Sequence, residues 1–165
     1  MMTRFFSMVL VCGLLVAAVP AQAQTKEYIG AAKCKMCHNK QPTGEQYNKW
    51  AASPHAKAMA SLKGDEAKNP KCLKCHSTAF GLKLSDTQTI TVAEGVSCES
   101  CHGAGSAYKT PTIMKDKAKA MAAGLVMPDD KLCKKCHNAE SPNFKGFDFK
   151  TYAAKIAHPN PAKGQ

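Results

Sequence analysis

Apolar residues are concentrated at the beginning of the chain and are scattered over the rest of it. Residues 5–19 form a largely apolar stretch that follows Arg4 and precedes a small-residue A-x-A sequence ending at Ala23. This arrangement is typical of a secretory signal peptide, and the stretch is too short for a membrane-spanning helix. We therefore predict that residues 1–23 are cleaved and that residues 24–165 form one exported domain without a membrane span.

Beyond this stretch, apolar residues recur at helical spacing in three segments, which are residues 43–62, 112–123 and 148–157. The third segment begins at Asp148, a residue type that caps helices through its side chain. The second is followed by Gly124, a typical C-cap. The pattern therefore predicts short helices separated by irregular chain.

Two local signals add detail to this picture. Ser53 followed by Pro54 is typical of an N-cap with proline at the first helical position, and predicts that a second short helix begins there. In residues 82–92, apolar and polar residues alternate on either side of Ser85-Asp86, which predicts a small β-hairpin.

The composition does not supply an ordinary hydrophobic core. Hydrophobic residues make up 44% of the chain and charged residues 21%, which is too apolar for a fully disordered protein. Aromatic residues, however, are only 7%, with one tryptophan, whereas there are nine cysteines. Something other than large apolar side chains must therefore fill the interior.

Eight of the nine cysteines occur in four C-x-x-C-H motifs, which are the attachment signature of c-type haem. Two thiols on one helical turn reach the two vinyl groups of the porphyrin, and the adjacent histidine ligates the iron. We therefore predict four covalently attached haem c groups. The attachment and ligating residues are Cys34, Cys37 and His38; Cys72, Cys75 and His76; Cys98, Cys101 and His102; and Cys133, Cys136 and His137.

Zinc sites and a disulfide framework are the two alternatives. Successive C-x-x-C pairs are separated by 34, 22 and 31 residues, longer than the about 15–20 residues common in zinc sites. Neither alternative explains a histidine after every second cysteine. With four haems, the chain becomes a wrapper around its cofactors. We therefore predict a mainly α fold of short helices and loops around the four haems, with one small β-hairpin and little regular secondary structure.

The net charge of +11 has two interpretations once haem is included. Nucleic-acid binding has no motif here and would require a different compartment. Lysines crowd three of the haem motifs, and they form either a docking surface for acidic redox partners or a solvated face. These lysines are Lys33, Lys35, Lys71, Lys74, Lys134 and Lys135.

The chain has few residues left to complete the iron coordination. Of six histidines, four belong to the motifs, so His55 and His158 remain as distal ligands. At most two haems can therefore have two histidine ligands within one chain. The other two need methionine, a different ligand, a neighbouring subunit or an open position.

The order of the motifs and their neighbours resembles the tetrahaem cytochrome c-554 family of ammonia-oxidising bacteria. The resemblance is carried by residues 50–62 (WAASPHAKAMASL), 72–81 (CLKCHSTAFG), 95–105 (GVSCESCHGAG) and the C-terminal helix that ends at His158. It implies a periplasmic electron carrier with closely stacked haem pairs. Its partners would be periplasmic or membrane-associated redox proteins, and it would not be an enzyme.

The resemblance also implies a ligand assignment. His55 would serve the haem on His137, His158 would serve the haem on His102, and the iron on His76 would be open. In the family, the first haem takes a distal histidine from the segment after the third motif. Residues 103–123 contain no histidine here.

The haem on His38 therefore lacks the family's distal ligand. We predict Met114 as its substitute, with an open site, Met121, Tyr108 or another chain as alternatives. Two other functions remain as alternatives to an electron carrier. One is a reductase of small nitrogen oxides at an open haem, and the other is a subunit of an electron-conducting filament.

Overall fold

The computed structural model describes residues 26–161, so the predicted signal peptide at residues 1–23 lies outside the described residues. The described chain forms short helices joined by irregular segments and contains no β-strand. This confirms the predicted mainly α fold with little regular structure. The α-helices are α1 (Ala31–His38), α2 (Gln46–Ala52), α3 (Pro70–His76), α4 (Cys98–His102), α5 (Pro111–Met114), α6 (Lys117–Ala122), α7 (Asp130–Cys133) and α8 (Phe149–Ile156). The 3₁₀ turns are Gln41–Thr43, Met59–Ser61, Gly64–Lys68, Val92–Glu94 and Gly105–Ala107.

Each C-x-x-C-H motif lies on or at the end of a helix. Helices α1, α3 and α4 end at the histidine of their motif, and α7 ends at the first cysteine of the fourth motif. Local caps start two of them: the Asn69 side chain accepts from the Lys71 N–H at 2.9 Å, and Asp129 accepts from the Leu132 N–H at 2.7 Å. Each helix is short because it needs only one turn to align two thiols.

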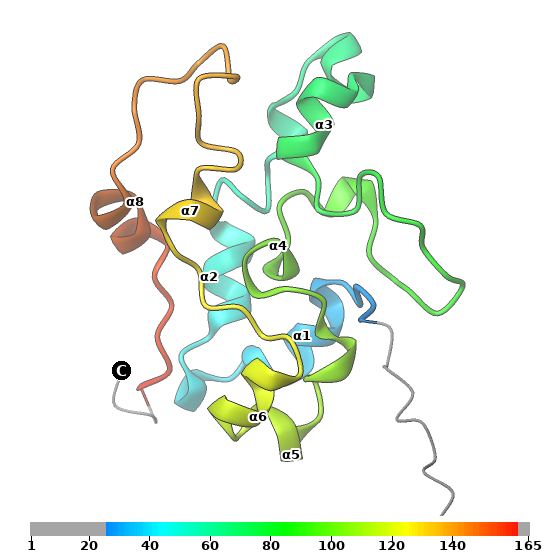
Figure 1. Cartoon of the computed structure of the whole chain (residues 1–165), viewed down its shortest axis with the longest axis vertical. Coiled ribbons are helices and arrows are strands. Elements are labelled where there is room, and N and C mark those ends of the chain that lie inside the picture. Colours follow the sequence, from blue (N-terminus) through cyan, green and yellow to red (C-terminus); the bar gives the residue numbers. More distant parts are fainter. Residues whose placement is uncertain (1–25, 162–165) are drawn as a thin grey trace, which may run out of the picture.

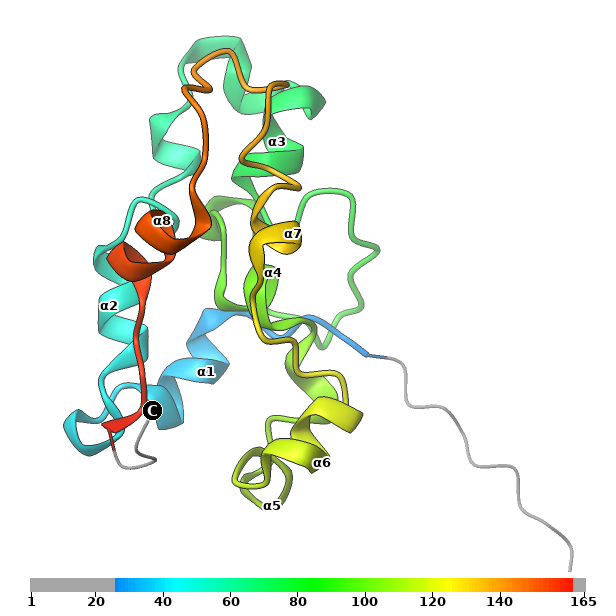
Figure 2. The same ribbon diagram turned by 60° about the vertical axis from the view of Figure 1, so that its left-hand side comes forward.

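The helices that carry the motifs are spread along the molecule. Helix α3 lies at one end of the long axis, α5 and α6 lie at the other end, and α4 lies between them (Figures 1 and 2). Helix α1 packs against α2 and α4. No helix among residues 26–161 has the length and apolarity needed to cross a membrane.

The buried apolar core is very small. Within the described chain, seven apolar residues are buried, namely Ile29, Ala31, Leu73, Ala79, Ile90, Tyr108 and Ala120. Three of these are alanines, and only one is aromatic. A core of this size is expected of a chain whose interior is completed by a large prosthetic group.

The predicted β-hairpin at residues 82–92 is wrong. The segment consists of turns and extended chain and ends in a 3₁₀ turn. Its residues contact a segment that is distant in the sequence, and they do not pair with a neighbouring strand. Ile90 is 2% exposed beside Gly30, and the Thr89 hydroxyl donates to the Ile29 carbonyl at 2.6 Å.

The second short helix predicted from Ser53 and Pro54 is replaced by consecutive turns and the 3₁₀ turn at Met59–Ser61. The Ser53 hydroxyl is buried without a hydrogen-bond partner, so it does not cap a helix. The His55 carbonyl accepts from the Val96 N–H at 3.0 Å, a tertiary bond that competes with a helical one. The chain therefore turns at His55 to meet the segment that precedes α4.

The helix predicted over residues 112–123 is divided into α5 and α6. Asp116 causes the break because its side chain accepts from the Lys119 N–H at 3.1 Å and caps α6. Gly124 follows the second part with a φ of 110°, consistent with its predicted role at the helix end. The helix predicted over residues 148–157 is confirmed as α8, with Asp148 accepting from the Thr151 N–H at 2.8 Å.

Candidate haem-binding sites

The structure brings four of the six histidine rings together in two pairs. His55 and His137 have ring centres 5.9 Å apart, and His102 and His158 have ring centres 6.0 Å apart. The rings of each pair are inclined at 72° and 76°, respectively. A transition metal held between two imidazoles needs about 4 Å between the ligand nitrogens, and ring centres at this separation are compatible with such a gap.

The hydrogen bonds of three histidines expose the correct nitrogen for a metal. A carbonyl oxygen only accepts, so the Nδ1 atom facing it carries the hydrogen and Nε2 keeps its lone pair. These contacts join His76 Nδ1 to the Ala58 carbonyl at 2.8 Å, His102 Nδ1 to the Val126 carbonyl at 3.1 Å and His158 Nδ1 to the Ile156 carbonyl at 2.8 Å.

The surroundings of the paired histidines also favour the neutral imidazole. Burial lowers the pKa of His55, and the nearby His137 lowers it further. Burial likewise lowers the pKa of His137 and of His102. The neutral ring is the form that can ligate iron, so the surroundings of these side chains favour the protonation state that ligation needs.

His55 is held in place by the segment that precedes the third motif. The Trp50 indole N–H donates to the Val96 carbonyl at 2.8 Å, and the Val96 N–H donates to the His55 carbonyl at 3.0 Å. Gly95 has a φ of 76°, and a Cβ atom there would lie 2.9 Å from the His55 carbonyl oxygen. Only glycine allows this close approach.

The motifs are neighbours in an order that differs from their order in the sequence. The Cys34 and Cys98 side chains lie beside each other and helices α1 and α4 pack together, which joins the first motif to the third. The Cys75 and Cys136 side chains also lie beside each other and line one cavity, which joins the second motif to the fourth. Burial and the neighbouring Cys133 raise the pKa of Cys101, which relates the third motif to the fourth. The spatial order is therefore first, third, fourth and second.

The cysteines of the described chain form no disulfide and no cluster of metal donors. All eight cysteines of the described chain are free thiols. Among residues 26–161, no group of three or more histidine, cysteine, aspartate or glutamate side chains is placed to hold a metal ion. The donors converge in pairs, which suits axial coordination of a porphyrin iron and does not suit a tetrahedral zinc site.

A cavity of about 190 Å³ lies where the second and fourth motifs meet, with walls that include Cys75, His76, Cys136, His137 and His55. On the other side of His137, the Phe147 ring stacks on the imidazole at 4.8 Å, and the Tyr152 ring stacks on Phe147 at 5.2 Å. The cysteines and histidines that line this cavity are the residue types that would attach and ligate a haem at the fourth motif.

His38 and His76 have no imidazole opposite them in the part of the chain that the structure describes. Met114 is half-buried at the end of α5, and α5 lies toward the same end of the molecule as α1 (Figures 1 and 2). Ligation by Met114 stays a prediction.

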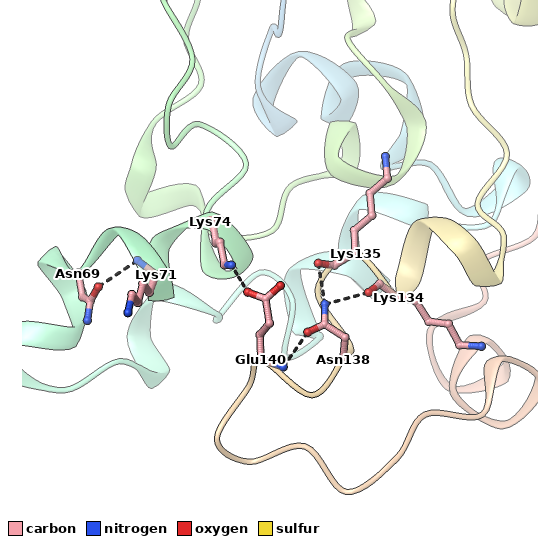
Figure 3. Close-up of polar contacts among 7 residues, drawn as sticks. All are labelled: Asn69, Lys71, Lys74, Lys134, Lys135, Asn138 and Glu140. Carbon is pink, nitrogen blue, oxygen red and sulfur yellow. Dashed lines mark hydrogen bonds and ion pairs between the residues drawn. The ribbon is translucent and has the colours of Figure 1, made fainter.

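The predicted basic surface is partly neutralised around the second and fourth motifs. Figure 3 shows Lys74 of α3 in an ion pair with Glu140, and Asn138 donating to the carbonyls of Lys134 and Lys135. The ammonium group of Lys134 also pairs with Asp130 at 2.7 Å. The hydrogen bond and charge of Glu140 raise the pKa of Lys74.

Glu99 is a site residue that sequence reasoning missed. It lies between the two cysteines of the third motif, and only 1% of its surface is exposed. Its carboxylate accepts from the backbone N–H groups of Ile29, Gly30 and Gly105 at 2.7–3.0 Å. Glu94 accepts from the Ala31 N–H at 2.9 Å, so two distant glutamates cap the start of α1. No local pattern in the sequence indicates hydrogen bonds between residues that are so far apart along the chain.

Comparisons with known proteins agree on one relationship. A family model described as cytochrome c554 and c-prime matches residues 33–103. A protein of Nitrosomonas europaea named cytochrome c-554 is 31% identical over 176 aligned residues, which cover 82% of this chain and 71% of that protein. No solved structure matches the chain.

Proposed function

The chain belongs to the cytochrome c-554 family, and from this premise we propose that it is an exported tetrahaem relay that passes electrons between redox proteins. Membership makes it a c-type cytochrome with covalently bound haem, an electron carrier. We infer the number of haems from the four C-x-x-C-H motifs, and we infer export from the A-x-A sequence that ends at Ala23.

The cysteine pairs would hold the porphyrins, and the motif histidines would provide the proximal ligands. Bound haem supplies an iron that takes up and releases one electron. The polypeptide orients the ligand rings through the hydrogen bonds of their Nδ1 atoms and through the contacts of their backbone. His55 with His137 and His102 with His158 are the two pairs that we assign to irons with two histidine ligands, because their spacing leaves room for one metal ion each.

The contacts between motifs support a relay. Electron transfer needs neighbouring cofactors, and each motif has a cysteine beside a cysteine of another motif. The order first, third, fourth and second places the two motifs without an imidazole pair at the two ends. Electrons would therefore enter and leave at the haems on His38 and His76 and pass through two six-coordinate haems between them.

The charge supports redox partners with acidic surfaces. Lys33 and Lys35 lie on α1 beside the first motif, and Lys71 lies on α3 beside the second. These lysines are at the two proposed ends of the relay. Acidic patches on a donor and an acceptor would be attracted to them and would approach the terminal haems.

Intact mass spectrometry tests the number of haems. We expect the mature protein to begin after Ala23 and to carry four haem additions, with a c-type pyridine haemochrome spectrum. As a matched control, the double variant Cys133→Ala, Cys136→Ala should carry three, because attachment at each motif uses its own two thiols. A mature chain with two or fewer haems would contradict the proposed function.

A small-molecule reductase is the second candidate function. It is favoured by His76, whose ring has no imidazole opposite it in the described chain. An iron on His76 would have an accessible sixth position, to which a small nitrogen oxide could bind. Turnover with nitric oxide or hydroxylamine would separate this function from electron transfer alone.

The distal ligand of the first haem gives a separate prediction. If Met114 ligates the iron on His38, the ferric protein shows a near-infrared charge-transfer band from sulfur to iron, and the band disappears in Met114→Leu. We then expect carbon monoxide to bind one ferrous haem per chain, the one on His76. Met121→Leu is the matched control and should keep the band. No band, together with two bound carbon monoxide molecules, would show that both sites are open.

A further inference from the structure

Glu99 is a buried charge without a counter-ion from the polypeptide. Its partners, the N–H groups of Ile29, Gly30 and Gly105, all donate hydrogen bonds, so the ionised carboxylate is the form that matches them. In the described chain, neither Glu99 nor Glu94 forms an ion pair with a lysine. Buried charges in proteins are normally paired or lie near a metal.

The negative charges of both glutamates lie close to residues of the first and third motifs. Glu99 follows Cys98 directly, and the Cys98 side chain lies beside that of Cys34 of the first motif, where α1 and α4 pack together. The charges of Glu99 and Glu94 both reach the Cys34 thiol. Burial raises the pKa of Tyr108, and the charge of Glu99 raises it further, so the field of this carboxylate extends through the corner where the two motifs meet.

The second and fourth motifs have a different electrostatic environment. Glu140 and Asp130, which lie beside them, are accessible to solvent and form ion pairs with Lys74 and Lys134. Figure 3 shows the pair of Glu140 and Lys74. Water and the paired lysines screen these carboxylates. Among the described residues, the buried carboxylate without an ion pair therefore lies in the half of the proposed relay that the first and third motifs form, whereas Asp129 beside the fourth motif is exposed.

We propose that Glu99, supported by Glu94, lowers the reduction potential of the haems held by the first and third motifs. A ferric haem carries one more positive charge than a ferrous haem, and a nearby carboxylate in a dry environment stabilises the ferric form. The cationic irons would in turn supply the counter-charge that Glu99 lacks. This inference rests on the proposed function, because it requires haem at these two motifs.

Redox titration of the complete haem-loaded protein tests the inference. Each haem is followed through its own low-spin resonance. The resonance that is lost in His158→Ala is assigned to the haem on His102, and the resonance that is lost in His55→Ala is assigned to the haem on His137. Glu99→Gln should favour reduction of the haem on His102 about tenfold, an upward shift of 59 mV for one electron. The haem on His137 should be unchanged, and Glu140→Gln should move neither.

Glu94→Gln keeps the inference testable if Glu99→Gln does not mature. Glu94 is half-buried and accepts one backbone hydrogen bond, so its replacement should be better tolerated and should shift the same half of the relay upward. Unchanged potentials in the variants that mature, or an equal shift of all haems, would overturn the inference. A protein without haem on the third motif would overturn the proposed function as well.

Discussion

Residues 24–165 produced without haem attachment are expected to show no cooperative thermal unfolding transition. Burying one large apolar side chain contributes about 1.5–3 kcal/mol, whereas ordering one residue costs about 1–2 kcal/mol in backbone entropy. The structure buries seven apolar residues within the described chain, and three of them are alanines. Protein contacts alone therefore cannot offset the entropy of the chain.

Circular dichroism on the haem-free and haem-loaded forms of the same residues measures this difference. The haem-loaded protein is the control and should unfold cooperatively, because the porphyrins complete the core. The haem-free chain should have little helix at any temperature, since helices of four to eight residues are not stable in isolation. A cooperative transition in the haem-free chain would show that the polypeptide has a sufficient core of its own.

The second large effect is expected from the distal histidines. His55→Ala and His158→Ala should each convert one low-spin ferric haem to the high-spin form and leave the haem content unchanged. Attachment uses the two cysteines of a motif and its own histidine, so the loss of a distal ring does not prevent it. Paramagnetic resonance and absorption spectra of the ferric protein count the two spin states directly.

The two substitutions should be independent because the two pairs share no ring. The double variant should therefore convert two haems, one for each pair. Lys57→Ala is a matched control, since Lys57 is exposed two residues after His55 and its ammonium contacts only the Ala52 carbonyl. A single variant with an unchanged ferric spectrum would mean that its histidine is structural.

Local signals were sufficient to predict α8. Its N-cap, its apolar stripe and its final proline lie within a dozen residues, and all of them favour the same helix. The haem motifs are equally local, because the chemistry of attachment fixes their spacing. The resemblance implied the two histidine pairs, which the structure brings together, and their ligation of iron stays a prediction.

Long-range contacts account for what the sequence did not predict. The alternation at residues 82–92 is real, but Ile90 packs beside Gly30 and no second strand is present in the described chain. The His55 carbonyl accepts from the Val96 N–H in addition to the Ala58 N–H, so a tertiary bond competes with the helical one expected after Pro54. Glu99 could not be found at all from the pattern, since its partners at Ile29 and Gly30 are remote in the sequence.

The link between Glu99 and the start of α1 also bears on the order in which the molecule is assembled. Its hydrogen bonds to Ile29 and Gly30 span 70 and 69 residues. Because the chain is synthesised from its N-terminus, the first motif is made early. Glu99, whose carboxylate holds the start of α1, is made only with the third motif. Contacts of such separation form late, after the intervening loop has closed. The first motif is therefore synthesised first, but its helix is among the last to take up its final position. Between these two events, its cysteines stay accessible to incoming haem.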